Sequence, residues 1–231
     1  MNKKIDSIAI DGGAGVGKST ISKLLAKKLG WKVLETGAIY RGITASFLAK
    51  NYPLNDENFV ADAVFGIKVE VKYIADVQHI FVDGIDLTAY LRSEIVENRV
   101  AIVAKVPTVR AKVRAVQREI AEKENVVVEG RDRGTVVLPN AKYKFFLVAD
   151  AEIRAKRRFK QLARRGEKPN LKKIHREILK RDKLDRTREV SPLVPAKDAV
   201  VVDTSALSVE ETVELLYSKI KTNQKDFSAE K

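Results

Sequence analysis

The chain has 231 residues, 45% of them hydrophobic and 32% charged, and its formal net charge at pH 7 is +13. This length and apolar content predict one folded domain with a sizeable core. The absence of cysteine excludes disulfide bonds and thiolate metal sites, and the two histidines, His79 and His175, stand too far apart for metal-ligand spacing. No run is long and apolar enough for a signal peptide or a membrane span, so the sequence predicts a cytoplasmic protein without a membrane partner.

Most of the positive charge is concentrated in one stretch, from Arg154 to Arg188. This stretch has sixteen Lys or Arg and four acidic residues, a net charge of +12, so the rest of the chain is nearly neutral. Such a concentration indicates a local polyanionic partner, either the phosphates of a nucleotide or an RNA backbone. A solvated helical face accounts for part of the charge, and charge alone does not decide between these interpretations.

The first fifty residues predict alternating strands and helices. Residues 7–10 form a short apolar run that stops at a glycine-rich segment, which is typical of a buried strand running into a loop. Residues 21–29 have the apolar spacing of a helix, residues 31–34 predict a second strand, and Thr36 is expected to cap a helix over about residues 38–50. This order is typical of a parallel sheet covered by helices.

The middle of the chain departs from this order. Residues 67–73 and 79–83 alternate apolar and polar side chains, which predicts a small antiparallel hairpin with one solvated face. Two helices are expected after the hairpin, over residues 93–105 and 108–123.

Buried strands resume after these helices. They are predicted at residues 126–128, 143–148 and 199–203, and a last helix is predicted at residues 209–220. Ser208, with an acidic residue three positions later, has the spacing of a capping box for that helix.

These elements predict a single domain over residues 1–223 with an insert at about residues 38–105. The basic stretch is expected to be helical with a break at residues 166–170, and residues 224–231 are expected to form a disordered tail.

The glycine-rich segment joins the first predicted strand to the first predicted helix. Residues 12–19 match the pattern G-x-x-x-x-G-K-[ST] of a phosphate-binding loop, and the flanking strand and helix argue against a chance match. The glycines let backbone N–H groups point at a β-phosphate, Lys18 reaches the β- and γ-phosphate oxygens, and the Ser19 hydroxyl binds Mg²⁺. The residues predicted to bind a nucleoside triphosphate, ATP or GTP, are Gly12, Gly13, Ala14, Gly15, Val16, Gly17, Lys18, Ser19 and Thr20.

Two other classes of phosphate-binding-loop protein fit the sequence less well. A GTPase needs an Asn-Lys-x-Asp motif, whereas the nearest string, residues 223–226, has a different order and lies in the predicted tail. A motor ATPase needs a hydrophobic strand that ends in adjacent acidic residues, which residues 126–129 resemble only loosely. The compact size favours a kinase of a small molecule.

Arginines at the ends of predicted elements indicate what this small molecule carries. A phosphate monoester is nearly dianionic at pH 7, so as an acceptor it needs neutralising charges rather than a general base. Three arginines stand at such ends: Arg41, Arg110 and Arg131. Another set shares one face of a predicted helix: Arg181, Asp185 and Arg188. Each alone fits a surface ion pair, but together they indicate a clamp for an anionic acceptor at the carboxyl ends of the strands.

Several strings of residues resemble the bacterial cytidylate kinase family, in that family's order over about residues 5–220. The strings are residues 12–20, 35–41, 107–110, 130–137 and 181–195. The resemblance implies an α/β P-loop NTPase fold in which helices flank a central parallel sheet. It also implies a small antiparallel insert for the monophosphate and a short helical lid.

The resemblance implies that MgATP is the phosphoryl donor and that CMP or dCMP is the acceptor. A lid at about residues 154–170 would close over ATP, so that Arg154, Arg157 or Arg158 reaches the transferred group. Arg154 would help to bind ATP. The catalytic residues would be Lys18, Arg131, Arg157 and Arg158.

The same resemblance implies an acceptor site in which different residues bind the phosphate, the ribose and the base. Its residues would be Thr36, Gly37, Tyr40, Arg41, Arg110, Arg131, Asp132, Arg181, Asp185 and Arg188. Thr36, Arg41 and Arg131 would hold the phosphate. Arg181 and Asp185 would hold the ribose. Arg110, Asp132 and Arg188 would read the cytosine edge, where a carboxylate suits the amino group and rejects the carbonyl of uracil.

The sequence departs from the family pattern at four positions. Ala101 stands where a serine often contacts the base, which puts the rejection of UMP in doubt. Glu35 replaces an aspartate, and Glu129 replaces a shorter residue. Arg133 occupies a usually apolar place and is expected to point into water.

Two alternatives stay open beside a CMP kinase. One is a kinase of another acceptor, such as UMP, AMP or a small alcohol. The other is an RNA-stimulated NTPase that uses the basic stretch, although Phe159 is the only aromatic residue there to stack on bases. The expected partners are therefore the small nucleotides CMP, dCMP and ATP, without nucleic acid, and the resemblance implies a monomer.

Overall fold

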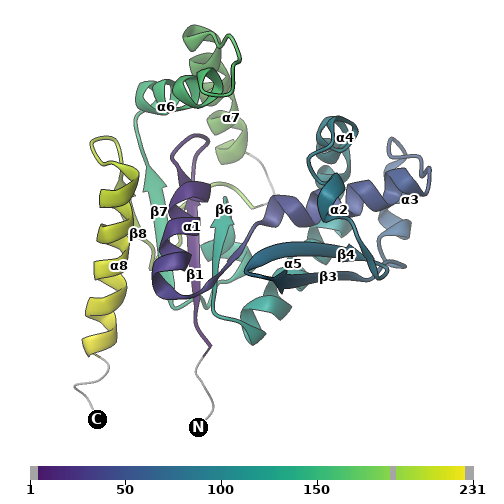
Figure 1. Ribbon diagram of the computed structural model, residues 1–231, viewed down its shortest axis with the longest axis horizontal. Coiled ribbons are helices and arrows are strands. Elements are labelled where there is room, and N and C mark those ends of the chain that lie inside the picture. Colours follow the sequence, from purple (N-terminus) through teal and green to yellow (C-terminus); the bar gives the residue numbers. More distant parts are fainter. Residues whose placement is uncertain (1–4, 188–190, 227–231) are drawn as a thin grey trace. The chain divides into compact units, whose positions relative to one another are not determined.

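The computed structural model describes residues 5–187 and 191–226 of the chain (Figure 1). The chain divides into two compact units, which are described in turn. The first unit contains Lys32–Asn125, and the second contains Asp6–Trp31 and the chain from Val126 onward. The organisation as one kinase domain over residues 1–223 with an insert stays a prediction.

A parallel sheet forms the centre of the second unit. Its strands β1 (Ser7–Gly12), β6 (Val126–Gly130), β7 (Tyr143–Val148) and β8 (Val200–Asp203) stand in the order β6-β1-β7-β8. Residues 8–10 of β1 are fully buried, as expected for an apolar strand covered on both faces. The predicted central parallel sheet with flanking helices is confirmed.

Among the described residues, the second unit has four α-helices: α1 (Lys18–Leu29), α6 (Ala151–Ala163), α7 (Leu171–Thr187) and α8 (Val209–Asp226). The capping box predicted for the last of them is confirmed. The Ser208 hydroxyl accepts the backbone N–H of Glu211 at 3.1 Å, and the Glu211 carboxylate accepts the N–H of Ser208 at 2.8 Å.

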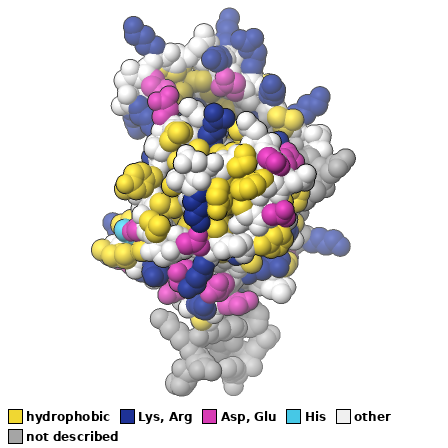
Figure 2. All heavy atoms as spheres, turned by 90° about the vertical axis from the view of Figure 1, so that its right-hand side faces the viewer, with side chains coloured by type: hydrophobic (Ala, Val, Ile, Leu, Met, Phe, Trp, Pro, Cys, Tyr) yellow, Lys and Arg dark blue, Asp and Glu magenta, His cyan; other side chains and the backbone are white. Residues whose placement is uncertain are grey.

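The basic stretch folds into a helical hairpin of α6 and α7, and the predicted break lies between the two helices. Ala155, Ile174 and Ile178 are buried in a small core of this hairpin, and Phe159 and Leu162 pack against it. The charged side chains lie outside this core. Many dark blue Lys and Arg side chains project at the upper end of Figure 2, the end at which Figure 1 shows α6 and α7.

The first unit combines helices with a small antiparallel sheet. The sheet order is β3-β4-β5, so the predicted hairpin is confirmed and a short third strand extends it. The two-residue turn of the hairpin has positive φ at Ala75 (48°) and Asp76 (63°), as the right-handed twist of a tight hairpin requires. The elements of this unit are β2 (Lys32–Leu34), α2 (Thr36–Ala49), α3 (Glu57–Ala63), β3 (Val69–Ile74), β4 (Val77–Val82), β5 (Ile85–Asp86), α4 (Glu94–Lys105) and α5 (Pro107–Lys123).

The prediction that Thr36 caps α2 is wrong. Glu35 is the flanking residue, and Thr36 is already the first helical residue. The Thr36 hydroxyl instead accepts a hydrogen bond from the Gln117 side-chain amide of α5, at 2.7 Å. A buried partner therefore fixes the orientation of Thr36 from outside its own helix.

No helix in the described part of the chain is both long and apolar enough to cross a membrane.

Candidate active site

The phosphate-binding loop leaves β1 at Gly12 and enters α1 at Lys18. The loop approaches the next strand so closely that a Cβ atom at residue 12 would lie 2.4 Å from the backbone oxygen of Leu147. Gly17, which precedes the helix, has φ of 95°, a conformation that side chains with a Cβ atom rarely adopt. Gly12 and Gly17 are thus required by the fold of the loop.

Lys18 lies inside this loop. Its Nζ donates to the backbone oxygens of Gly12 at 2.8 Å and Gly13 at 2.7 Å, and the residue is only 6% exposed. The pKa of Lys18 is lowered to about 7, mainly by burial and also by the nearby positive charge of Arg131. The ammonium group thus lies among loop carbonyls, and it loses its proton more easily than an exposed lysine does.

Ser19 and Glu129 bring oxygen atoms together beside the loop. The Ser19 hydroxyl donates to the Glu129 carboxylate at 3.3 Å, and Glu129 is the second-last residue of β6, the strand next to β1. Hydroxyl and carboxylate oxygens are suitable ligands for Mg²⁺, which usually takes only one or two protein groups and completes its shell with water and phosphate. No group of three His, Cys, Asp or Glu that could hold a metal occurs among the described residues.

Arg131 follows β6 and is held by a carboxylate of α7. Its Nε donates to Asp185 at 2.7 Å, and the two side chains are 18% and 16% exposed. The parallel strands β1 and β6 are neighbours, so the phosphate-binding loop and Arg131 leave the sheet at the same edge. This is the edge at which open α/β sheets bind ligands.

The prediction that Arg133 points into water is wrong. Arg133 and Asp132 are 8% and 3% exposed, and the Arg133 Nη2 donates to Asp132 at 2.6 Å. Gly130 makes room for this arginine, because a Cβ atom at residue 130 would lie 2.2 Å from the Arg133 Nε. A nearby carboxylate and a glycine together allow this charged residue to be buried.

Asp11 fixes the turn that carries this pair. Its two carboxylate oxygens accept the backbone N–H groups of Arg133 and Gly134, each at 2.8 Å. Burial raises the pKa of Asp11, and the two backbone hydrogen bonds oppose that rise. Asp11 therefore links the end of β1 to the turn that contains Asp132.

The three arginines predicted for the lid have different surroundings. Arg154 is 6% exposed, and its guanidinium donates to the backbone oxygen of Ala14 in the phosphate-binding loop at 3.0 Å. Arg157 instead donates to the backbone oxygen of Thr204, at 2.5 Å, after β8. Arg158 is exposed and donates to Gln161 within its own helix at 2.7 Å. Only Arg154 contacts the loop directly, and roles for the other two toward the transferred phosphate stay predictions.

The remaining predicted acceptor residues are distributed over both units. Arg41 is half-buried in α2, 3.9 Å from the Glu97 carboxylate, and burial lowers its pKa. Arg181 is exposed on α7. Arg188 lies outside the described residues. The first unit holds Thr36, Gly37, Tyr40, Arg41 and Arg110, of which all but Arg110 lie in the first turns of α2.

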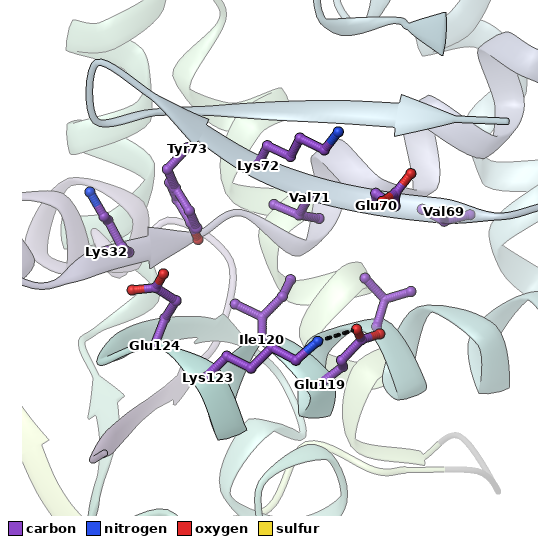
Figure 3. A pocket seen from close by; sticks show the side chains of 11 residues that line it. Lys32, Val69, Glu70, Val71, Lys72, Tyr73, Glu119, Ile120, Lys123 and Glu124 are labelled. Atoms are coloured by element: carbon purple, nitrogen blue, oxygen red, sulfur yellow. Dashed lines mark hydrogen bonds and ion pairs between the residues drawn. The ribbon is translucent and has the colours of Figure 1, made fainter. Parts of the chain in front are cut away.

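A groove of about 530 Å³ lies elsewhere in the first unit, between β3 and α5 (Figure 3). Apolar side chains form part of its lining, and charged ones include Lys123, which pairs with Glu119 at 2.7 Å. The Tyr73 hydroxyl at one end donates to the backbone oxygen of Val33 at 3.0 Å. None of the predicted site residues lines this groove.

Sequence reasoning missed two residues that contact the predicted site. Asp182 pairs with Arg154 at 2.7 Å, and Gln117 donates to Thr36. Asp182 stands three residues before Asp185, a spacing that places both carboxylates on one helix face and could have drawn attention to it. The sequence carries no comparable signal for Gln117, because its partner is 81 residues away.

Comparison with known proteins gives a consistent result along almost the whole chain. Residues 8–222 match the sequence model of a family described as cytidylate kinase. A cytidylate kinase of Carboxydothermus hydrogenoformans is 47% identical over 89% of this chain and 93% of its own length. A cytidylate kinase of Bacillus subtilis is 43% identical over 95% of this chain and 98% of its own length.

A solved structure adds support for the fold alone. An uncharacterized protein from Eubacterium ventriosum, 15% identical in sequence, superposes with a TM-score of 0.53 over 95% of this chain and 99% of its own.

Proposed function

The chain belongs to the cytidylate kinase family, and we propose that it transfers the γ-phosphoryl group of MgATP to CMP and to dCMP, giving the diphosphate and ADP. The observation that carries this proposal is the placement of Lys18 and Arg131 at one edge of a parallel sheet. A donor triphosphate on the loop and an acceptor phosphate on Arg131 would meet there.

The acceptor needs positioning and charge neutralisation more than it needs a base. Its phosphate oxygen is already anionic near pH 7, so the residues must bring two polyanions together in line. Lys18 would neutralise the β- and γ-phosphates, and Arg131 would hold the acceptor phosphate together with Thr36 and Arg41. Closure of the α6–α7 hairpin would exclude water and so limit hydrolysis of ATP.

Ser19 supplies a hydroxyl oxygen suited to hold Mg²⁺, and the Glu129 carboxylate next to it suits the same ion or its water. When bound, Mg²⁺ neutralises charge on the β- and γ-phosphate oxygens.

Arg110, Asp132 and Arg188 are proposed to read cytosine, and Arg181 and Asp185 to hold the sugar. A buried carboxylate at residue 132 suits the amino group of cytosine and would leave the carbonyl of uracil unpaired, at a cost of about 1–3 kcal/mol. This cost corresponds to a preference for CMP over UMP of roughly 5- to 150-fold.

ATP binding is expected to draw a proton onto Lys18. Its pKa of about 7 leaves it about 10% protonated at pH 8, and the triphosphate charge would raise that pKa well above 8. The expected proton uptake per bound nucleotide is therefore larger at pH 8, where Lys18 is mostly neutral, than at pH 6, where it is mostly protonated. Calorimetric titrations in two buffers of different ionisation enthalpy measure it. A Lys18→Met variant that binds ATP should show no uptake, and equal uptake by both proteins would contradict this assignment.

The proposed function is tested by ADP release from MgATP with CMP, dCMP, UMP, AMP or no acceptor. Fast turnover is expected with CMP and dCMP, slow turnover with UMP, and none with AMP. Equal rates with UMP would refute the base selection and fit a general pyrimidine kinase. ADP release that depends on RNA and on no monophosphate would refute the kinase proposal.

A further inference from the structure

Helix α7 presents two carboxylates to two arginines of the proposed site. Asp185 accepts from Arg131 at 2.7 Å, and Asp182 pairs with the Arg154 Nη1 at 2.7 Å. The two aspartates are three residues apart, so they lie on the same face of the helix. Arg131 belongs to the proposed acceptor site and Arg154 to the proposed ATP site, so one helix face supports both.

Arg154 is held at three points. Its Nε donates to the backbone oxygen of Ala149 at 2.8 Å, and its Nη1 donates to Ala14 at 3.0 Å and contacts Asp182. The side chains of Arg154 and Asp182 are 8% and 13% exposed. A guanidinium that is buried and bonded in this way has one orientation rather than several.

The ion pair lies directly against the phosphate-binding loop. A Cβ atom at Gly13 would lie 3.0 Å from the Asp182 Oδ1 and 3.1 Å from the Arg154 Nη1. The Asp182 Oδ1 is buried and has no hydrogen-bond partner among the described residues. The loop thus has a glycine where the pair packs against its backbone, and one carboxylate oxygen faces the loop.

A purely structural ion pair explains these features poorly. A buried pair is seldom worth more than well-packed apolar residues of the same volume, because both charges must leave water. The contacts with Ala14 and Gly13 place this pair directly at the phosphate-binding loop. A pair at this position is better explained by a role in orienting a side chain at the loop than by its contribution to stability.

We propose that Asp182 is the positioning residue of Arg154, fixing its guanidinium at the phosphate-binding loop so that ATP meets an arginine already in place. This inference rests on the proposed function, in which Arg154 is an ATP-binding residue. Without the carboxylate, Arg154 would lose its charged partner and ATP binding would have to restore its orientation. Loss of the Asp182 carboxylate should therefore weaken the use of ATP and leave the binding of CMP nearly unchanged.

Replacement of the carboxylate by an amide tests this role. Asp182→Asn is expected to lower kcat/KM for ATP by about 10- to 100-fold and to change the KM for CMP by less than about 2-fold. In an Arg154→Met background the same replacement should have an effect of less than about 2-fold, because the residue that it positions is gone. Glu177→Gln, an equal change of charge at an exposed position of α7, should leave the kinetics unchanged.

The outcomes separate positioning from other roles. An Asp182→Asn effect of equal size in both backgrounds, a lower KM for ATP, or a loss that falls equally on CMP would overturn the proposal. Should Asp182→Asn not fold by thermal melting, Asp182→Glu provides the test, since it keeps the charge and should lose kcat/KM for ATP but not for CMP. Failure of the proposed function itself would be distinct, because the unaltered chain would then form no CDP.

Discussion

Replacing Lys18 with methionine is expected to lower kcat for CDP formation by about a thousandfold or more. Methionine has nearly the same length as lysine but carries no charge. The Lys18 Nζ is positioned by the carbonyl groups of Gly12 and Gly13, so no other side chain of the loop can take its place. The loss should fall on kcat more than on the KM for ATP, since the charge on the transferred group develops mainly in the transition state.

Stability should not account for that loss. Burial lowers the pKa of Lys18, which means that the folded chain accommodates its charge less well than water does. Lys18→Met should therefore melt at the same temperature or higher in the absence of nucleotide. Lys27→Met, at an exposed position of the same helix, serves as the control with normal kinetics. A Lys18→Met enzyme that retains a tenth of the activity would show that the loop does not act on the transferred phosphate.

Replacing Arg131 with methionine is expected to lower kcat/KM for CMP by about 100- to 1000-fold. Arg131 follows the strand beside the phosphate-binding loop, where an acceptor phosphate would meet a planar guanidinium with two parallel donors. The KM for ATP should change by less than about 3-fold, because the donor contacts stay. The kcat/KM for CMP of Arg131→Lys should lie between the values of the unaltered protein and Arg131→Met. Lysine keeps the positive charge but lacks the two parallel N–H donors of the guanidinium.

Initial rates over a matrix of CMP and ATP concentrations measure the Arg131 effect. Arg99→Met, an exposed arginine of α4, controls for the loss of one positive charge. An unchanged kcat/KM for CMP in Arg131→Met, or a loss that falls on ATP instead, would remove Arg131 from the acceptor site.

The elements nearest the phosphate-binding loop were predictable because their signals are local. An apolar run, a glycine-rich turn and a helix with apolar spacing occur consecutively, so β1, the loop and α1 follow from neighbouring residues alone. The capping box at Ser208 was predictable for the same reason, since its two hydrogen bonds join residues three positions apart.

Residues whose partners are distant in sequence were not predictable in this way. Asp132 and Gly130 are close to Arg133 in sequence, but the turn that buries Arg133 beside them is fixed by Asp11, 122 residues away. The orientation of Thr36 depends on Gln117 of another helix. By residue type alone, an arginine is expected to be exposed and a threonine before a helix is expected to cap it. Contacts in the tertiary structure override both preferences here.

The candidate site shows both situations. Lys18 and Ser19 are recognisable from their motif, and Arg131 and Asp185 from the family resemblance. The pairing of Asp182 with Arg154 joins α7 to the start of α6, and no motif within either helix specifies it. Such contacts decide which predicted residues have a fixed orientation. Among the residues that the structure describes, the exposed Arg158 has no such contact with the loop.

The most direct test of the central claim is a ³¹P NMR spectrum of the protein with MgATP and CMP. We expect the γ-phosphate signal of ATP to disappear while the CDP and ADP signals grow in equal amounts, without inorganic phosphate. Release of inorganic phosphate with CMP unchanged, or no change in ATP at all, would contradict phosphoryl transfer to CMP.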